Sequence, residues 1–87
     1  MTEEKVVFEC RSDLKLDKVV ATLVQKASEF RSTVYLVEGG RRANAKSLLG
    51  VISLGIDNGA EITVTADGAD ANEAVKSLVE YLKDPKV

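Results

Sequence analysis

The chain contains stretches in which apolar and polar residues alternate, the pattern of a β-strand with one buried face. It predicts strands at Lys5–Cys10 and Glu61–Ala66, and a third at Thr33–Glu38. Gly39-Gly40 supplies the positive backbone angles of a tight hairpin, so Arg41–Asn44 should return as a short strand. The faces expected to be buried carry Val6, Phe8 and Cys10 in the first strand and Ile62, Val64 and Ala66 in the last.

Three other segments carry apolar residues at steps of three and four, as amphipathic helices do. In the first we expect Asp17 to cap the helix and Lys18 to open it. The second follows Ser47 and ends near Gly55, and Asp57-Asn58-Gly59 is a strong turn after it. The predicted core stripe of the first helix is Val20, Leu23, Val24, Ala27 and Phe30.

The last helix should begin at Asp70 and Glu73, which are spaced like a capping box, and Asp84-Pro85 should end it. Its apolar stripe is Ala71, Ala74, Val75, Leu78, Val79 and Leu82. The full order is strand, helix, strand, strand, helix, strand, helix. It predicts an α+β fold, an open-faced two-layer sandwich with a four-stranded antiparallel sheet and three helices on one face. We expect residues 1–87 to form a single domain.

Composition narrows the possible functions. The net charge is -2 and the start of the chain is acidic and polar, so we expect a cytoplasmic protein without direct nucleic-acid or membrane binding. The absence of histidine excludes histidine-based catalysis and histidine phosphorylation, and a lone Cys10 cannot form an internal disulfide. Asp67, Asp70 and Glu73 fit a turn and a cap better than a cation site. We therefore expect no enzymatic activity, catalytic residue, metal or cofactor.

The candidate chemistry lies around Ser47, where a loop enters the short helix. A serine there can serve only as a cap, or it can also accept a phosphate, which the helix dipole would favour. The helix has apolar residues on more than one side, and we expect Leu48 and Ile52 to form an exposed patch unless neighbouring helices cover it. A basic rim is expected from Lys15, Lys18, Arg41, Arg42 and Lys46, although each taken singly reads as solvated charge.

Four segments carry a resemblance to HPr, the small phosphocarrier of the bacterial phosphotransferase system. The most specific is residues 44–55, NAKSLLGVISLG, which resembles the regulatory-serine helix of that family. Residues 23–27, 58–63 and 68–74 also resemble HPr segments. The resemblance covers about residues 5 to 83 and implies the βαββαβα fold of HPr.

The resemblance fails at the family's active-site motif, G-[IL]-H-A-R-P-A. Leu16 stands where the phosphorylated histidine would be, Lys18 where the arginine would be, and Val19 where the proline would be. Leucine has no nucleophilic nitrogen, and Asp17 adds a negative charge that would repel a phosphoryl group. Phosphotransfer through histidine should therefore be lost, as in the histidine-less, Crh-like members.

What the resemblance still implies is regulation through Ser47. The implied partners are HPr kinase/phosphorylase and a LacI-type transcription regulator of carbon catabolite control. The implied contact residues are Lys18, Lys46, Leu48, Leu49 and Ile52, with Lys18 able to pair with a phosphate on Ser47. One alternative is an unphosphorylated decoy that competes with true HPr for enzyme I or enzyme II proteins. Another is a phosphocarrier that uses Asp17 as acceptor, for which the sequence shows no activating site.

Overall fold

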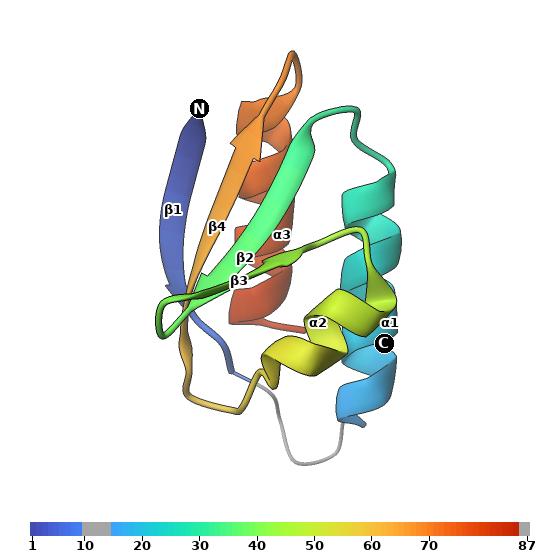
Figure 1. Cartoon of the computed structure of the whole chain (residues 1–87), viewed down its shortest axis with the longest axis vertical. Helices are drawn as coiled ribbons and strands as arrows, with labels where there is room; N and C mark the ends of the chain where they lie inside the picture. The colour runs from blue at the N-terminus through green and yellow to red at the C-terminus, as the bar shows by residue number, and fades with distance from the viewer. Residues whose placement is uncertain (10–14, 86–87) are drawn as a thin grey trace.

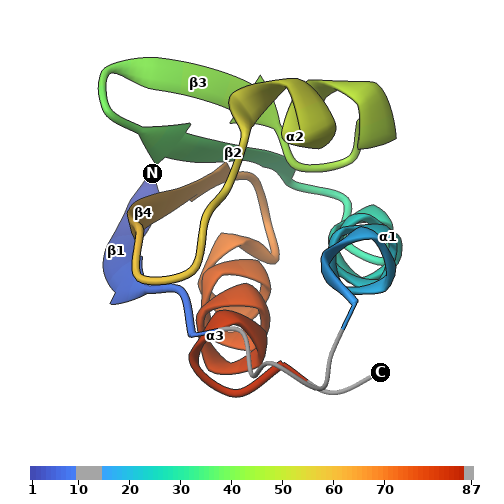
Figure 2. The ribbon, with the colours of Figure 1, turned by 90° about the horizontal axis from the view of Figure 1, so that it is seen from below.

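A computed structural model describes residues 1–9 and 15–85 of the chain. Its elements are β1 (Thr2–Val7), α1 (Leu16–Ser28), β2 (Thr33–Glu38), β3 (Arg41–Asn44), α2 (Leu48–Leu54), β4 (Glu61–Asp67) and α3 (Ala71–Lys83). The strands form one antiparallel sheet in the order β1-β4-β2-β3. The helices all lie on the same face of this sheet (Figure 1, Figure 2). The predicted open-faced α+β sandwich is confirmed.

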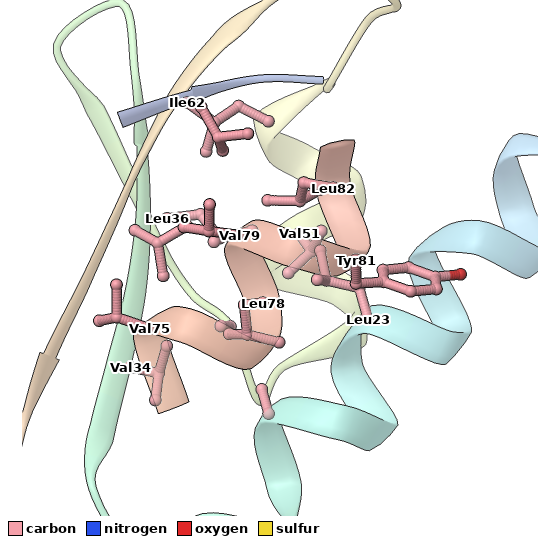
Figure 3. Packing of buried hydrophobic residues seen from close by; sticks show 14 of the residues in the cluster. Leu23, Val34, Leu36, Val51, Ile62, Val75, Leu78, Val79, Tyr81 and Leu82 are labelled. Atoms are coloured by element: carbon pink, nitrogen blue, oxygen red, sulfur yellow. The ribbon is translucent and has the colours of Figure 1, made fainter. Parts of the chain in front are cut away.

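The core fills the space between the sheet and the helices, as the alternation along the strands predicts. Leu36 of β2 lies opposite Val64 of β4 and opposite Ala43 of β3, and all three are buried. Leu78 and Leu82 of α3 and Leu23 of α1 close the core from the helical side (Figure 3). Burial of this apolar surface is the main force that holds the helices on the sheet. Within the described residues, no helix is long and apolar enough to cross a membrane.

The first strand ends earlier than predicted. It pairs with β4 from Thr2 opposite Ala66 to Val7 opposite Glu61, where β4 begins. Beyond Val7, Phe8 faces the turn before β4 instead of a strand, and its carbonyl accepts the N–H of Gly59 at 2.8 Å. Phe8 is nevertheless buried as predicted, and its backbone N–H donates to the Ala60 carbonyl at 2.8 Å. The prediction for Cys10 falls outside the described residues.

Helix α1 begins two residues before the predicted start, so the prediction that Asp17 caps it is wrong. Lys15 is the N-cap, with extended backbone angles, and its carbonyl accepts the N–H groups of Lys18 and Val19, each at 3.1 Å. Asp17 lies inside the first turn, where its carboxylate accepts the N–H of Lys18 at 2.9 Å. The helix also ends at Ser28, and Phe30 packs against the core from the following turn instead of from the helix.

Asp70 links the loop between β4 and α3 to the loop between α1 and β2. It occupies the N-cap position of α3 but makes no capping hydrogen bond, so the predicted capping box is wrong. Its carboxylate instead accepts the N–H groups of Arg31 and Ser32, each at 2.9 Å, and the Ser32 hydroxyl. The Ser32 hydroxyl, followed by the N–H of Arg31, lowers the pKa of Asp70 from 3.8 to about 2.

Gly68 permits this junction, because the chain just after β4 approaches Ser32 closely there. The φ angle of Gly68 is 149°, and a Cβ at this position would lie 2.6 Å from the Ser32 hydroxyl oxygen and 2.8 Å from Ser32 Cα. We expect Gly68→Ala to lower the free energy of unfolding by about 1–3 kcal/mol, as overpacking does. Denaturant unfolding measures this value.

Gly40→Ala is the matched control for that change. Gly40 also has a positive φ, 79°, but a Cβ there would meet no atom within 4 Å. The control carries only the backbone strain of a left-handed residue and should cost less than Gly68→Ala. Equal losses in the two variants would contradict the steric role of Gly68.

The lowered pKa of Asp70 predicts how acid affects stability. The folded-state pKa of about 2 lies below the ordinary value of 3.8 for an aspartate, so the ionised carboxylate favours the fold. This contribution is complete above about pH 4 and is lost as the pH falls from the unfolded value through about 2. Asp70→Asn should remove this part of the pH dependence in thermal unfolding measured between these values. Glu73→Gln, in the same helix turn, is the control and should retain it, and an unchanged acid profile for Asp70→Asn would refute the role of Asp70.

Candidate functional site

Ser47 caps helix α2, as the sequence predicts. Its backbone is extended, and its hydroxyl oxygen accepts the N–H of Gly50 at 3.1 Å. Its own N–H donates to the Asn44 carbonyl at 3.0 Å, and its carbonyl accepts the N–H of Val51 at 3.0 Å. The serine is therefore fixed on both sides of the loop-to-helix junction. Its side chain is half-buried, with the hydroxyl at the start of the helix.

Gly50 lies close against the Ser47 hydroxyl, a contact that the sequence reasoning missed. A Cβ on Gly50 would lie 3.2 Å from the Ser47 hydroxyl oxygen and 3.7 Å from the Asn44 carbonyl oxygen. Glycine inside a helix costs stability relative to alanine. A glycine inside so short a helix, three residues after a serine, is a sequence signal. It indicates that the Gly50 backbone lies close to the Ser47 side chain.

Lys46 is tied into the fold. The Asn44 side-chain oxygen accepts the Lys46 N–H at 2.9 Å, which shapes the loop before the helix. The Lys46 ammonium reaches across to the Phe30 carbonyl just after α1, at 2.7 Å in a part-buried position. It thus connects the start of α2 to the end of α1. Sequence reasoning missed this contact, and a role for Lys46 in partner binding stays a prediction.

The apolar residues of α2 divide into two sets, as predicted. Val51 and Leu54 are buried against the rest of the protein, at 1% and 4% exposure. Leu48, Leu49 and Ile52 remain 46%, 77% and 55% exposed. Neighbouring helices do not cover these three side chains. We call them the α2 patch.

The residues of the predicted basic rim come from separate elements, and whether they act together stays a prediction. Arg41 donates from its guanidinium to the Ser53 carbonyl near the end of α2, and the Arg42 guanidinium stacks 4.4 Å from the centre of the Tyr35 ring. Both arginines line a hollow of about 280 Å³ between β3 and α2, and Ser47 lines the same hollow. Lys15 and Lys18 lie exposed at the start of α1.

A second hollow, of about 290 Å³, lies between the start of α1 and the end of α2. Leu16 and Ile52 line it from opposite helices, and Leu16 is 42% exposed. Figure 2 shows the two helices next to each other on the helical face of the molecule. The structure thus brings the residue expected at the histidine position beside the α2 patch. No group of three or more potential metal ligands occurs among residues 1–9 and 15–85.

Comparison with known proteins places this arrangement in a family. A family model described as "PTS HPr component phosphorylation site" matches residues 3–84. HPr-like protein Crh of Bacillus subtilis (strain 168) is 36% identical over 84 residues, which cover 97% of this chain and 98% of that protein. The chain therefore belongs to the HPr family of the phosphotransferase system.

Solved structures agree with this assignment. Phosphocarrier protein HPr from Bacillus anthracis matches with a TM-score of 0.86 and 33% identity, over 93% of this chain and 95% of that one. The crystal structure of Bacillus subtilis Crh, a catabolite repression protein that forms a dimer through a swapped domain, matches with a TM-score of 0.76 and 34% identity. That alignment covers 100% of this chain and 99% of Crh.

The capping bond of Ser47 predicts the effect of removing its hydroxyl. Ser47→Ala leaves the Gly50 N–H without its acceptor and should lower the free energy of unfolding by about 1 kcal/mol. Ser47→Asp should retain most of the stability, because aspartate is an equally good N-cap. Urea unfolding compares the variants with Ser53→Ala, an exposed serine of the same helix. A loss no larger in Ser47→Ala than in Ser53→Ala would contradict the capping role.

Proposed function

We propose that the protein is a non-enzymatic, cytoplasmic regulator in the phosphotransferase system and carbon catabolite control. It is phosphorylated on Ser47, and it binds the HPr kinase/phosphorylase and a LacI-type transcription regulator through α2. The observation that carries the proposal is the position of Ser47 directly beside the exposed α2 patch. A phosphate there changes the charge at the edge of an apolar contact surface without any change of fold.

The surroundings of Ser47 favour an added phosphate. Arg41 and Arg42 line the hollow that Ser47 also lines, so a phosphate on Ser47 would lie on the same hollow as two cationic side chains. To bind it, the guanidinium groups would exchange their present partners, the Ser53 carbonyl and the Tyr35 ring. The N–H groups at the start of α2 lack intrahelical acceptors and carry partial positive charge. Lys18, in the first turn of the neighbouring α1, is a further candidate cation, although as a point charge it would bind a phosphate without the bidentate geometry of arginine. The dianion is thus expected to leave α2 folded.

The α2 patch favours partner binding over phosphotransfer. Exposed apolar side chains clustered on one short element are typical of protein–protein contacts. The chain contains no histidine, so a phosphohistidine cannot form on it. Its relative Crh of Bacillus subtilis is an HPr-like protein of catabolite repression. These features together support regulation through binding, with Leu48, Leu49 and Ile52 as contacts.

Incubation with ATP and an HPr kinase/phosphorylase tests the proposal. Intact-mass and peptide mass spectrometry should find one added phosphate, and fragmentation should place it on Ser47. Ser47→Ala should remove the modification completely, because no other side chain can take the phosphate in the same position. Ser53→Ala, in the same helix, should be modified like the wild type.

Ordinary HPr, treated in parallel, shows that the kinase is active. If HPr gains phosphate and this protein does not, the proposal is refuted. It is also refuted if the phosphate is found on Ser53 and persists in Ser47→Ala.

A further inference from the structure

We infer that Arg41 is the internal partner of a phosphate on Ser47 and that it changes its acceptor on phosphorylation. In the unmodified protein its guanidinium holds the Ser53 carbonyl near the end of α2. With the phosphate present, the guanidinium leaves Ser53 and binds the phosphate at the start of the helix. The inference deepens the proposed function, because it rests on phosphorylation of Ser47 and names the residue that responds to it.

The hollow between β3 and α2 connects the two acceptors. Figure 2 shows this strand and this helix next to each other. Ser47, Gly50 and Ser53 line the hollow from the helix at steps of three residues, so they lie on one side of it. About 9 Å of helical rise separates Ser47 from Ser53, and Gly50 between them has no side chain to divide the space. Arg41 lines the same hollow from β3, so rotation about its side-chain bonds can carry the guanidinium along α2 while β3 stays in place.

The two cations that follow Arg41 before α2 are engaged elsewhere. The Arg42 guanidinium stacks 4.4 Å from the centre of the Tyr35 ring. Because successive side chains of a strand point to opposite faces of the sheet, Arg41 and Arg42 lie on different faces. The Lys46 ammonium donates to the Phe30 carbonyl at 2.7 Å in a part-buried position. Either cation would lose a stacked or part-buried contact on binding a phosphate, whereas the present bond of Arg41 is exposed to water.

Charge favours the phosphate over the acceptor that Arg41 has now. A carbonyl is neutral, whereas a phosphoserine carries a charge of about −1.5 to −2 and three strong acceptor oxygens at neutral pH. Arginine binds such a group through two parallel hydrogen bonds, each roughly twice as strong as a bond between neutral groups. The Glu38 carboxylate, opposite Arg41 in the register of β2 and β3, is a weaker competitor because it carries a single charge. The exchange leaves the Ser53 carbonyl to water, which the exposure of Ser53 permits.

The exchange couples the two ends of α2. Before phosphorylation, the bond from Arg41 fixes the carbonyl of Ser53, directly before the buried Leu54. When the guanidinium leaves, this end of the helix loses one of the contacts that hold it, while the start of the helix gains a charged pair. A phosphate on Ser47 therefore alters the last turn of α2 as well as its own surroundings, and Ile52 of the α2 patch lies in that turn.

Phosphorus NMR tests the pairing directly. Phosphoserine is incorporated at position 47 of the full chain during translation, so the test is independent of any kinase. A guanidinium beside the phosphate favours the dianion, so the second pKa of the phosphate should be lower in the wild-type background than in Arg41→Gln. Arg41→Lys retains the charge without the bidentate fork and should give an intermediate pKa. Arg42→Gln is the matched control, because it removes the same charge from the adjacent residue and should leave the pKa of the phosphate at its wild-type value.

Two further measurements follow the guanidinium from one acceptor to the other. In ¹³C-labelled protein, the phosphate should shift the carbonyl resonance of Ser53, because this carbonyl loses its donor. In Arg41→Gln the resonance should already be shifted without phosphate and should not move further. The phosphate should also raise the Tm by about 3 °C more in the wild-type background than in Arg41→Gln, the size expected of an exposed charged pair in a small domain. Thermal unfolding of the unphosphorylated variants shows that each is folded.

Several results would overturn the inference. These are an equal pKa of the phosphate in the wild-type background and in Arg41→Gln, a larger change in Arg42→Gln or Lys18→Gln than in Arg41→Gln, or a Ser53 carbonyl resonance that the phosphate does not move. Modification of Ser47 by the kinase is measured separately. If the kinase modifies Ser47 but Arg41→Gln changes nothing, the role of Arg41 alone is refuted. If incorporated phosphoserine pairs with Arg41 but the kinase adds no phosphate, the proposed function alone is refuted.

Discussion

The candidate site depends on how a helix of only seven residues is kept folded. Isolated helices of this length are not stable in water, so tertiary contacts must hold α2 in place. Val51 and Leu54 anchor it in the core, and its two ends are fixed by different neighbours. The Ser47 hydroxyl satisfies an N–H at its start, and the Arg41 guanidinium binds a carbonyl near its end. The sheet and loops, more than the helix itself, therefore determine where Ser47 lies.

This way of holding the helix leaves its outer side unused by the fold. Val51 and Leu54 are buried and anchor α2, whereas Leu48, Leu49 and Ile52 are 46%, 77% and 55% exposed and bury less apolar surface. Polar residues at these three positions would satisfy the fold equally well and would favour solubility. Exposed positions of a helix are normally polar, and a cluster of apolar residues at such positions without benefit to folding is expected at a partner-binding surface. The same helix thus separates the apolar residues that anchor it from those that remain exposed to solvent.

The sequence predicts features that depend on residues close together in the chain. It does not predict contacts between residues far apart in the chain. Alternation fixes which faces of β2 and β4 are buried, and Gly39-Gly40 forms the hairpin with φ angles of 56° and 79°. The role of Asp70 could not be predicted, because its hydrogen-bond donors lie 38 and 39 residues away and displace the expected local cap.

In the candidate site, too, contacts between neighbouring residues could be predicted and contacts between distant residues could not. The cap at Ser47 is local and was predicted, whereas the bond between Lys46 and the Phe30 carbonyl, 16 residues apart, is set by how α2 docks beside α1. The close approach of Gly50 to Ser47 is local in sequence, and the glycine inside so short a helix is its only sequence signal. Backbone geometry shows how tight the approach is, since a Cβ on Gly50 would lie 3.2 Å from the Ser47 hydroxyl oxygen.

The start of α1 shows why this family's active-site position can change its chemistry without loss of the fold. Val19, expected at a proline position, is buried and donates its N–H to the Lys15 carbonyl, a bond that proline cannot make. Leu16, expected at the histidine position, is 42% exposed, so the core does not require an apolar residue there. A residue that merely replaced a lost histidine would be expected to be polar. Leucine instead adds apolar surface beside Ile52, which lines the same hollow from α2.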